Sequence, residues 1–130
     1  MKLTAFDHLV LTVADIGRSV DFYVRVLGME EITFGDNRKA LRFGAQKINL
    51  HQLGAEVLPN AQHAGCGTAD LCLLTDTPLE QVLRELQQHG VECLSGIVQR
   101  TGAMGPIRSV YLRDPDGNLL EISRYESSPR

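Results

Sequence analysis

One carboxylate lies in the middle of a predicted strand. The segment Arg113–Ser123, RDPDGNLLEIS, begins with a turn, because Pro115 fixes φ and Gly117 accepts a positive φ. Its second half, LLEIS, is typical of a strand and contains Glu121. Such a carboxylate is either a solvated surface charge or one member of a site completed by residues far away in the chain. Other parts of the sequence decide between these two interpretations.

Two parts of the chain repeat one spacing of residues. FDHLVLTV alternates polar and apolar side chains, and a helical pattern that ends near Gly28 follows it. ADLCLLT alternates in the same way, and the helical pattern after it ends near Gly90. His8 precedes Gly28 by as many residues as Asp70 precedes Gly90. The two ionisable residues therefore hold equivalent positions in a repeated strand–helix unit.

Strand-like segments follow each predicted helix. They are residues 31–35, 38–43 and 47–53 in the first half, and 92–100, 107–112 and 119–125 in the second. Asp15 is the expected N-cap of the first helix, and Thr77–Glu80 is expected to form a capping box with Pro78 at the first helical position. The pattern predicts an α+β fold made of two βαβββ modules.

The two modules are expected to form a single domain over residues 1–130. The first module covers 1–53, a linker covers 54–67, the second module covers 68–126, and the last four or five residues are predicted to be a frayed tail.

Composition and charge exclude several classes of protein. The net charge is −3 with acids and bases intermixed, which argues against nucleic-acid binding, because that needs clustered Lys and Arg. No apolar run approaches the roughly 18 residues of a membrane span, and no secretory signal is apparent. The three cysteines are an odd number without a CxxC pattern, which is typical of reduced thiols and predicts a cytoplasmic location.

Several segments together resemble a known family. DHLVLTVAD, INLHQLG and SVYLRDPDGNLLEIS are similar to parts of the vicinal oxygen chelate superfamily, which includes glyoxalase I, extradiol dioxygenases, fosfomycin-resistance proteins and metal-free bleomycin-binding proteins. The closest likeness is to small glyoxalase-domain proteins, some of them bacterial and described as virulence-associated. The resemblance covers residues 6–125. It implies that the modules curl into a cup-shaped mixed sheet, commonly completed in a homodimer.

The resemblance also implies a metal site on the inner face of the first and last strands. Carried onto this sequence, it gives His8, Asp70 and Glu121, with one more ligand from the end of the first module. Asn49 matches Glu121, and His51 lies two residues further on the same face. Imidazole is the better ligand for a transition metal, so we expect His51 to bind the ion or a water beside it, with Asn49 as the weaker candidate.

Imidazoles and carboxylates form a mixed ligand set that suits Zn, Ni, Co, Mn or Fe. Such an ion acts as a Lewis acid on two vicinal oxygens of a substrate, while Glu121 or Asp70 moves a proton. Like charges around one cup are also costly without a cation between them. The usual residue at the position of Asp70 is His. Neither glyoxalase I activity nor extradiol cleavage therefore transfers directly to this chain.

Further polar residues are expected to contact the substrate. Ser109 and Tyr111 share one face of a predicted strand, and the resemblance places this face inside the cup. Arg100 is a candidate for binding a carboxylate, a phosphonate or a thiol conjugate, and Arg38 or Lys39 offers the same chemistry from the first module. The remaining predicted substrate contact is Asn49.

The leading functional hypothesis is a metal-dependent lyase or isomerase of the glyoxalase type, similar to lactoylglutathione lyase, acting on a small molecule with vicinal oxygens. Glutathione or another thiol is a possible cosubstrate. One alternative is a metal-free protein that binds or sequesters a small molecule. The other is a ring-cleaving dioxygenase, which Asp70 and the short chain disfavour.

Overall fold

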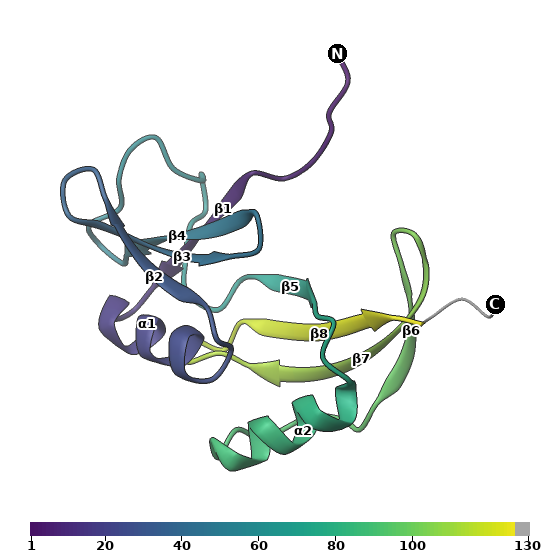
Figure 1. The fold of residues 1–130 in the computed structure, drawn as a ribbon. Helices are drawn as coiled ribbons and strands as arrows, with labels where there is room; N and C mark the ends of the chain where they lie inside the picture. Colours follow the sequence, from purple (N-terminus) through teal and green to yellow (C-terminus); the bar gives the residue numbers. More distant parts are fainter. Residues whose placement is uncertain (127–130) are drawn as a thin grey trace. The chain divides into compact units, whose positions relative to one another are not determined.

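The computed structural model describes residues 1–126, and the tail predicted after the last strand lies outside this range. These residues form two compact units (Figure 1). The first unit contains Met1–Ala69 and the short segment Pro115–Gly117, and the second begins at Asp70 and contains the remaining described residues. Among residues 1–126, no helix is both long and apolar enough to cross a membrane.

The first unit is a βαβββ module with one four-stranded sheet. Its elements are β1 (His8–Val13), α1 (Ile16–Arg25), β2 (Glu30–Phe34), β3 (Arg38–Phe43) and β4 (Gln46–Gln52). The strand order is β1-β4-β3-β2, with β1 parallel to β4 and the other pairs antiparallel.

The second unit repeats this plan. Its elements are β5 (Asp70–Leu74), α2 (Leu79–Gln88), β6 (Val98–Gly102), β7 (Gly105–Arg113) and β8 (Leu119–Tyr125). The order is β5-β8-β7-β6, with β5 parallel to β8. The predicted α+β fold of two βαβββ modules is therefore confirmed, and His8 and Asp70 each open the first strand of their unit.

Each sheet packs apolar side chains on one face and carries polar side chains, several of them buried, on the other. Side chains alternate along a strand, so the apolar residues of β1, β3 and β4 gather on one side. The core of the first unit contains Leu11, Val13, Phe22, Tyr23, Leu41, Ile48 and Leu50, all buried. In the second unit the corresponding residues are Leu79, Leu86, Val110, Leu112, Leu120 and Ile122. The opposite faces of the two sheets carry the predicted site residues.

The two helix starts differ in how well the sequence predicts them. Asp15 caps α1 as expected, because its side chain accepts a 3.0 Å hydrogen bond from the Arg18 backbone N–H. The capping box predicted at Thr77 is wrong: the N-cap of α2 is Pro78, which is extended and has no side-chain cap. The Thr77 N–H instead donates to the Thr75 hydroxyl at 3.0 Å, which holds Thr77 outside the helix.

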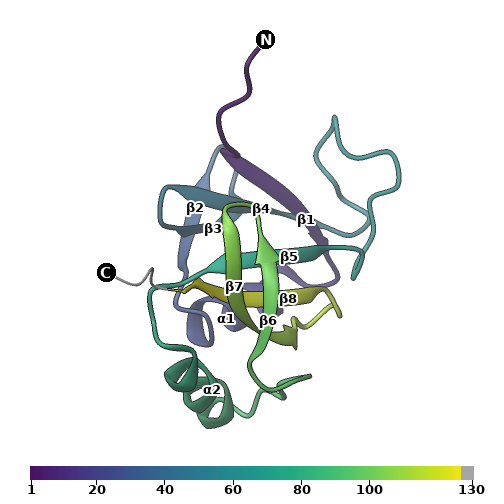
Figure 2. The ribbon, with the colours of Figure 1, turned by 90° about the vertical axis from the view of Figure 1, so that its right-hand side faces the viewer.

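The predicted boundaries fail around the hairpin of β6 and β7, which Figure 2 shows clearly. A strand was expected from residue 92, but β6 begins at Val98, because the preceding segment bends at Ser95, whose hydroxyl bonds to the Gly96 carbonyl. A long loop was expected before β7, but Gly102 pairs with Gly105 and leaves a tight two-residue turn.

The DPDGN turn is held at both ends and at its tip. Within the second unit, Asn118 donates to both carboxylate oxygens of Asp114, at 2.9 Å from its backbone and 2.7 Å from its side chain. Asp116 belongs to the first unit and has a side chain only 2% exposed. Its carboxylate accepts hydrogen bonds from the Ala14 N–H at 3.1 Å and the Arg18 guanidinium at 3.3 Å, beside the start of α1.

Candidate functional site

The polar face of the second unit brings several predicted site residues together. Glu121 on β8 pairs with Cys72 on β5 at one side and with Tyr111 on β7 at the other. Asp70 pairs with Leu119, two residues before Glu121, so both carboxylates lie on one face of neighbouring strands. The strand register alone therefore places Asp70 and Glu121 close enough to act on a common ligand.

Two buried hydroxyls hold Glu121. The Ser109 hydroxyl donates to Glu121 Oε2 at 2.6 Å and lies 2.7 Å from the Ser123 hydroxyl. Each hydroxyl has one proton, so both contacts are satisfied when Ser123 donates to Ser109 and Ser109 donates to the carboxylate. The Cys72 thiol donates in turn to Ser123 at 3.2 Å. A chain of three donors thus ends on Glu121 Oε2, and within residues 1–126 no group donates to Oε1.

This geometry changes the role expected for Ser109. The residue is fully buried, and its hydroxyl is engaged by Glu121 and Ser123. It is therefore placed to position the carboxylate, and the arrangement does not support the expected direct contact with substrate. Sequence reasoning overlooked Ser123 and Cys72, although each lies two residues from a predicted ligand on the same strand face.

The pKa of the Cys72 thiol depends on the burial and the charges of this face. Desolvation by the surrounding sheet raises the pKa of its thiol, and the carboxylates of Glu121 and Asp70 raise it further, whereas the hydrogen bond to Ser123 lowers it. Both predicted carboxylates thus act electrostatically on one thiol of the second unit.

Arg100 and Tyr111 also meet on the second unit. Arg100 Nε donates to the Tyr111 hydroxyl at 3.0 Å, and its guanidinium carbon lies 5.4 Å from the centre of that ring. Within residues 1–126 no carboxylate forms an ion pair with Arg100. Its positive charge remains available to an anionic ligand, although contact with substrate stays a prediction.

His8 presents one ring nitrogen from the first unit. Its Nδ1 lies 2.8 Å from Asp7 Oδ2, and its side chain is 44% exposed. A carboxylate on one imidazole nitrogen fixes the ring and leaves the other nitrogen as a lone-pair donor, as in many metal sites. Nε2 of His8 has no hydrogen-bond partner within the described residues.

The register separates His8 from His51 in the sheet of the first unit. His8 pairs with Lys47, whereas His51 pairs with Thr12, four residues further along the same strand pair. This separation is roughly 13 Å along the strands, whereas an imidazole nitrogen binds a metal at about 2.0–2.1 Å. The register therefore gives no support to an ion shared by His8 and His51 of one chain, and a ligand role for His51 stays a prediction.

The register also shows that Asn49 and Glu121 hold equivalent positions in the two units. His8 and Asp70 each pair with the residue two positions before Asn49 or Glu121, respectively. The match between Asn49 and Glu121 expected from the sequence is therefore confirmed. Asn49 and His51 are both only 5% exposed. Burial, followed by the nearby charge of Arg38, lowers the pKa of His51, and the charge of Glu56 opposes this shift.

A metal site of three protein ligands is not complete in the described part of the chain, where no group of three His, Cys, Asp or Glu side chains is placed to hold an ion. The donor chemistry nevertheless suits a divalent metal. His8 offers a free imidazole nitrogen, and Glu121 offers an unengaged carboxylate oxygen.

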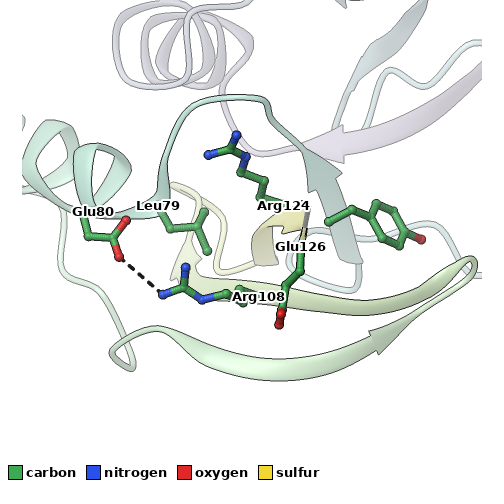
Figure 3. Close-up of a pocket in the computed structure, with 6 residues that line it drawn as sticks. Leu79, Glu80, Arg108, Arg124 and Glu126 are labelled. Atoms are coloured by element: carbon green, nitrogen blue, oxygen red, sulfur yellow. Dashed lines mark hydrogen bonds and ion pairs between the residues drawn. The ribbon is translucent and has the colours of Figure 1, made fainter. Parts of the chain in front are cut away.

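The second unit also contains a pocket away from this polar face, drawn in Figure 3. Its volume is about 280 Å³, and its lining consists of Leu79, Glu80, Arg108, Arg124, Tyr125 and Glu126. An ion pair of 3.3 Å joins Arg108 to Glu80 across it. None of the predicted site residues lines this pocket.

A family model decides the relationship of the chain to known proteins. The model of the Glyoxalase/Bleomycin resistance protein/Dioxygenase superfamily matches residues 5–122. The chain belongs to this superfamily. The resemblance drawn from DHLVLTVAD and SVYLRDPDGNLLEIS is thereby confirmed.

Individual members of the glyoxalase superfamily are similar over most of their length. The chain is 54% identical over 125 residues to virulence protein STM3117 of Salmonella typhimurium, covering 96% of this chain and 87% of that protein. The crystal structure of STM3117 matches with a TM-score of 0.96, covering 97% of this chain and all of that chain.

Two further relatives are more distant. Glyoxalase domain-containing protein RDO1 of Mycosarcoma maydis is 47% identical over 128 residues, covering 98% of this chain and 72% of that protein. Metallothiol transferase FosB of Staphylococcus epidermidis is 25% identical over 122 residues, covering 94% and 82%. The superfamily thus contains metalloenzymes, whereas the names of the two more similar relatives state no reaction.

Proposed function

We propose that the protein is a divalent-metal-dependent enzyme of the glyoxalase type, a lyase or isomerase acting on a small molecule with vicinal oxygens. The observation that carries the proposal is the carboxylate of Glu121, which Ser109 fixes through Oε2 at 2.6 Å while Oε1 accepts no hydrogen bond within residues 1–126. A carboxylate oriented through one oxygen and open at the other is what a metal ligand requires.

The proposed ligands are Glu121, Asp70 and His8, and the ion is Zn, Ni, Co, Mn or Fe. These side chains supply the nitrogen and oxygen donors that such ions accept. A metal bound by them would serve as a Lewis acid toward two adjacent substrate oxygens. His51 is left out of this set, because the register of β1 and β4 separates it from His8.

The residues of the chain supply the other steps. Asp70 lies on the same face as Glu121 and accepts no hydrogen bond within residues 1–126, so its carboxylate is available to take a proton from a substrate carbon and return it. Arg100, oriented by Tyr111 at 3.0 Å, would bind an anionic group of the substrate or of a thiol conjugate.

A metal-free binding protein is the second candidate. The observation that favours it is the lack, within residues 1–126, of any group of three potential ligands placed to hold an ion. In that function the polar faces of the two sheets would bind a small molecule without transforming it.

Metal analysis of untagged protein separates the two candidates. The enzyme hypothesis expects about one divalent ion per chain and a rise in melting temperature on adding the ion, because a ligand that binds only the folded state stabilises it. Glu121→Gln and His8→Ala should each lose the metal. Fewer than about 0.1 ion per chain with no such rise would support the binding protein.

Two matched substitutions control this experiment. Glu92→Gln and His63→Ala remove the same chemical groups from positions outside the proposed site, and both should retain the metal. Circular dichroism would verify that every variant is folded. If Glu121→Gln binds as much metal as Glu92→Gln, the ligand assignment is wrong.

Two finer expectations belong to the same proposal. Turnover that requires glutathione or another thiol would identify a thiol cosubstrate, and activity assays with and without thiols test this. The family resemblance further implies a homodimer, for which sedimentation equilibrium should give twice the mass of the chain.

A further inference from the structure

Four buried polar atoms of the first unit have no hydrogen-bond partner among residues 1–126. They are Arg38 Nε, Asn49 Oδ1 and both ring nitrogens of His51. Buried polar atoms in folded proteins are almost always paired, because an unpaired one has lost its water and gained nothing in return. Four such atoms on three residues are therefore a feature that needs an explanation.

The strand register gathers these atoms on one face. Asn49 and His51 are two residues apart on β4, so they point to the same side of the sheet. Lys39 pairs with Leu50, and Ala40 pairs with Asn49, which places Arg38 beside His51 on the same face of β3. Asn49 and His51 are each 5% exposed. The unpaired atoms thus form one buried cluster, defined by Arg38, Asn49 and His51.

The atoms themselves specify the chemistry of a partner. Arg38 Nε is always a donor, Asn49 Oδ1 is an acceptor, and a neutral imidazole has one donor and one acceptor. A partner must therefore present acceptor oxygens to Arg38 Nε and to the protonated His51 nitrogen, and a donor to Asn49 Oδ1. A carboxylate with a hydroxyl on the adjacent carbon pairs these three atoms and leaves the acceptor nitrogen of His51 to a water molecule.

The charges around the cluster favour an anion. The Arg38 guanidinium carbon lies 4.8 Å from the Phe34 ring centre, and Lys47 Nζ lies 3.9 Å from the same centre. Within residues 1–126, neither cation forms an ion pair with a carboxylate. Glu56, whose charge acts on His51, uses its Oε2 to accept a 3.1 Å hydrogen bond from the Gly54 N–H. The cluster therefore has excess positive charge and a free donor.

Lys39 provides the contrast on the same strand. It is one residue from Arg38 and points to the opposite face, where it forms a 3.2 Å ion pair with Glu31 and donates to Thr33 at 2.8 Å. The adjacent lysine is fully partnered, so the unpaired state of Arg38 is a property of its face and not of the strand.

We propose that Arg38, Asn49 and His51 form a binding site for a small 2-hydroxycarboxylate. The ligand carboxylate accepts hydrogen bonds from Arg38 Nε and from the His51 ring, and the ligand hydroxyl donates to Asn49 Oδ1. Lys47 and the Phe34 ring contact the remainder of the ligand. Lys47 is the β4 partner of His8 and lies two residues before Asn49, so this cluster adjoins a proposed metal ligand, and its binding is therefore tested on metal-free protein.

Glycolate, the smallest 2-hydroxycarboxylate, is the probe of choice. Titration into ¹⁵N-labelled, EDTA-treated protein, followed by NMR, should shift the His51 ring and Asn49 side-chain signals to saturation. Acetate lacks the hydroxyl and ethylene glycol lacks the carboxylate, so both should bind more weakly. If glycolate leaves these signals unchanged up to high millimolar concentration, the cluster binds only water and the proposal fails.

Variants of the cluster complete the test. Arg38→Lys keeps the charge but removes the Nε donor, and Asn49→Asp keeps the shape but repels a carboxylate. Each should weaken glycolate binding roughly 10- to 100-fold, the effect of one charge-assisted hydrogen bond. Lys39→Ala should bind as the parent does. Equal binding by the parent and by both cluster variants would overturn the assignment. Because metal is absent throughout, failure here leaves the proposed enzyme function untouched.

Discussion

The hydroxyl of Ser109 donates a 2.6 Å hydrogen bond to Oε2 of Glu121 across the antiparallel pair of β7 and β8. The two residues do not lie directly opposite each other, because Ser109 pairs with Ser123 and Tyr111 pairs with Glu121. The hydrogen bond therefore runs diagonally across the two strands. Short bonds from a hydroxyl to a carboxylate are among the stronger hydrogen bonds in proteins. The bond therefore determines which carboxylate oxygen is left for a ligand.

Ser109→Ala should loosen Glu121 without removing it. The substitution deletes a buried donor to a charged group, which is worth about 1.5–3 kcal/mol of folding stability. If Glu121 is a metal ligand, loss of a hydrogen-bonded partner should also weaken metal binding by roughly 10- to 100-fold. Urea denaturation and competition with a metal-sensitive dye measure the two effects.

Ser95→Ala is the matched control for this change. Among residues 1–126 the Ser95 hydroxyl bonds only to the neighbouring Gly96 carbonyl, at 2.9 Å, so its removal should leave metal affinity unchanged. A Ser109→Ala protein that binds metal as tightly as the control would show that Ser109 has only a structural role.

Cys72 should respond to the charge of Glu121. The carboxylate helps to raise the pKa of the thiol, so Glu121→Gln should lower it and increase the thiolate fraction near pH 8. Alkylation of Cys72 by iodoacetamide should therefore be faster in the variant. Its pH–rate profile should also move to lower pH. Mass spectrometry of the alkylated peptides gives the rate of each cysteine separately.

Cys93 provides the internal control in the same sample. Burial alone raises the pKa of its thiol, with no contribution from Glu121. Its alkylation rate should be the same in both proteins. Equal acceleration of the two cysteines would indicate general loosening of the fold rather than an electrostatic effect.

The fold was predictable because its signals are local and occur twice. The strand alternation around His8 and Asp70 and the helices after them follow from side-chain periodicity. The errors lie at boundaries. Pro78 takes an extended conformation and becomes the N-cap itself, and the glycines Gly102 and Gly105 pair across a tight turn where a loop was expected.

The candidate site was only partly predictable. The alternation of side chains along β8 is enough to place Glu121 on the polar face. It does not reveal which carboxylate oxygen of Glu121 accepts the hydrogen bond from Ser109. The separation of His8 from His51 depends on the register of two strands far apart in the sequence. The unpaired atoms of Arg38 depend on burial, which is a property of the folded chain and not of residue type.

Asp116 should stabilise the first unit through the start of α1. Its carboxylate accepts hydrogen bonds from the Ala14 N–H and from Arg18, and it is almost fully buried. Asp116→Ala would leave the Ala14 donor unpaired, so we expect a loss of about 1–3 kcal/mol. Asp36→Ala, in an exposed turn, should change stability by less than about 0.5 kcal/mol. Thermal and urea denaturation would contradict this role if the two variants are equally stable.

Gly67 should tolerate no side chain, for two separable reasons. Its φ of +71° is unfavourable for other residues, and a Cβ there would lie 2.5 Å from the Asp116 carbonyl oxygen. Gly54 has a φ of +85° but open space around the same position. Gly54→Ala should therefore cost only the backbone term, about 1–2 kcal/mol.

Gly67→Ala should cost clearly more than Gly54→Ala, because the Asp116 backbone has to move away. The difference between their free energies of unfolding isolates the steric contact from the conformational term. Equal losses would mean that the turn at Asp116 yields freely, and the anchoring of that turn against the first unit would then be weak. Gly67→Ala can be combined with Asp116→Ala in a double-mutant cycle. A larger loss for Gly67→Ala that shrinks in the Asp116→Ala background would show that the Asp116 carboxylate holds in place the backbone carbonyl that the new side chain must displace.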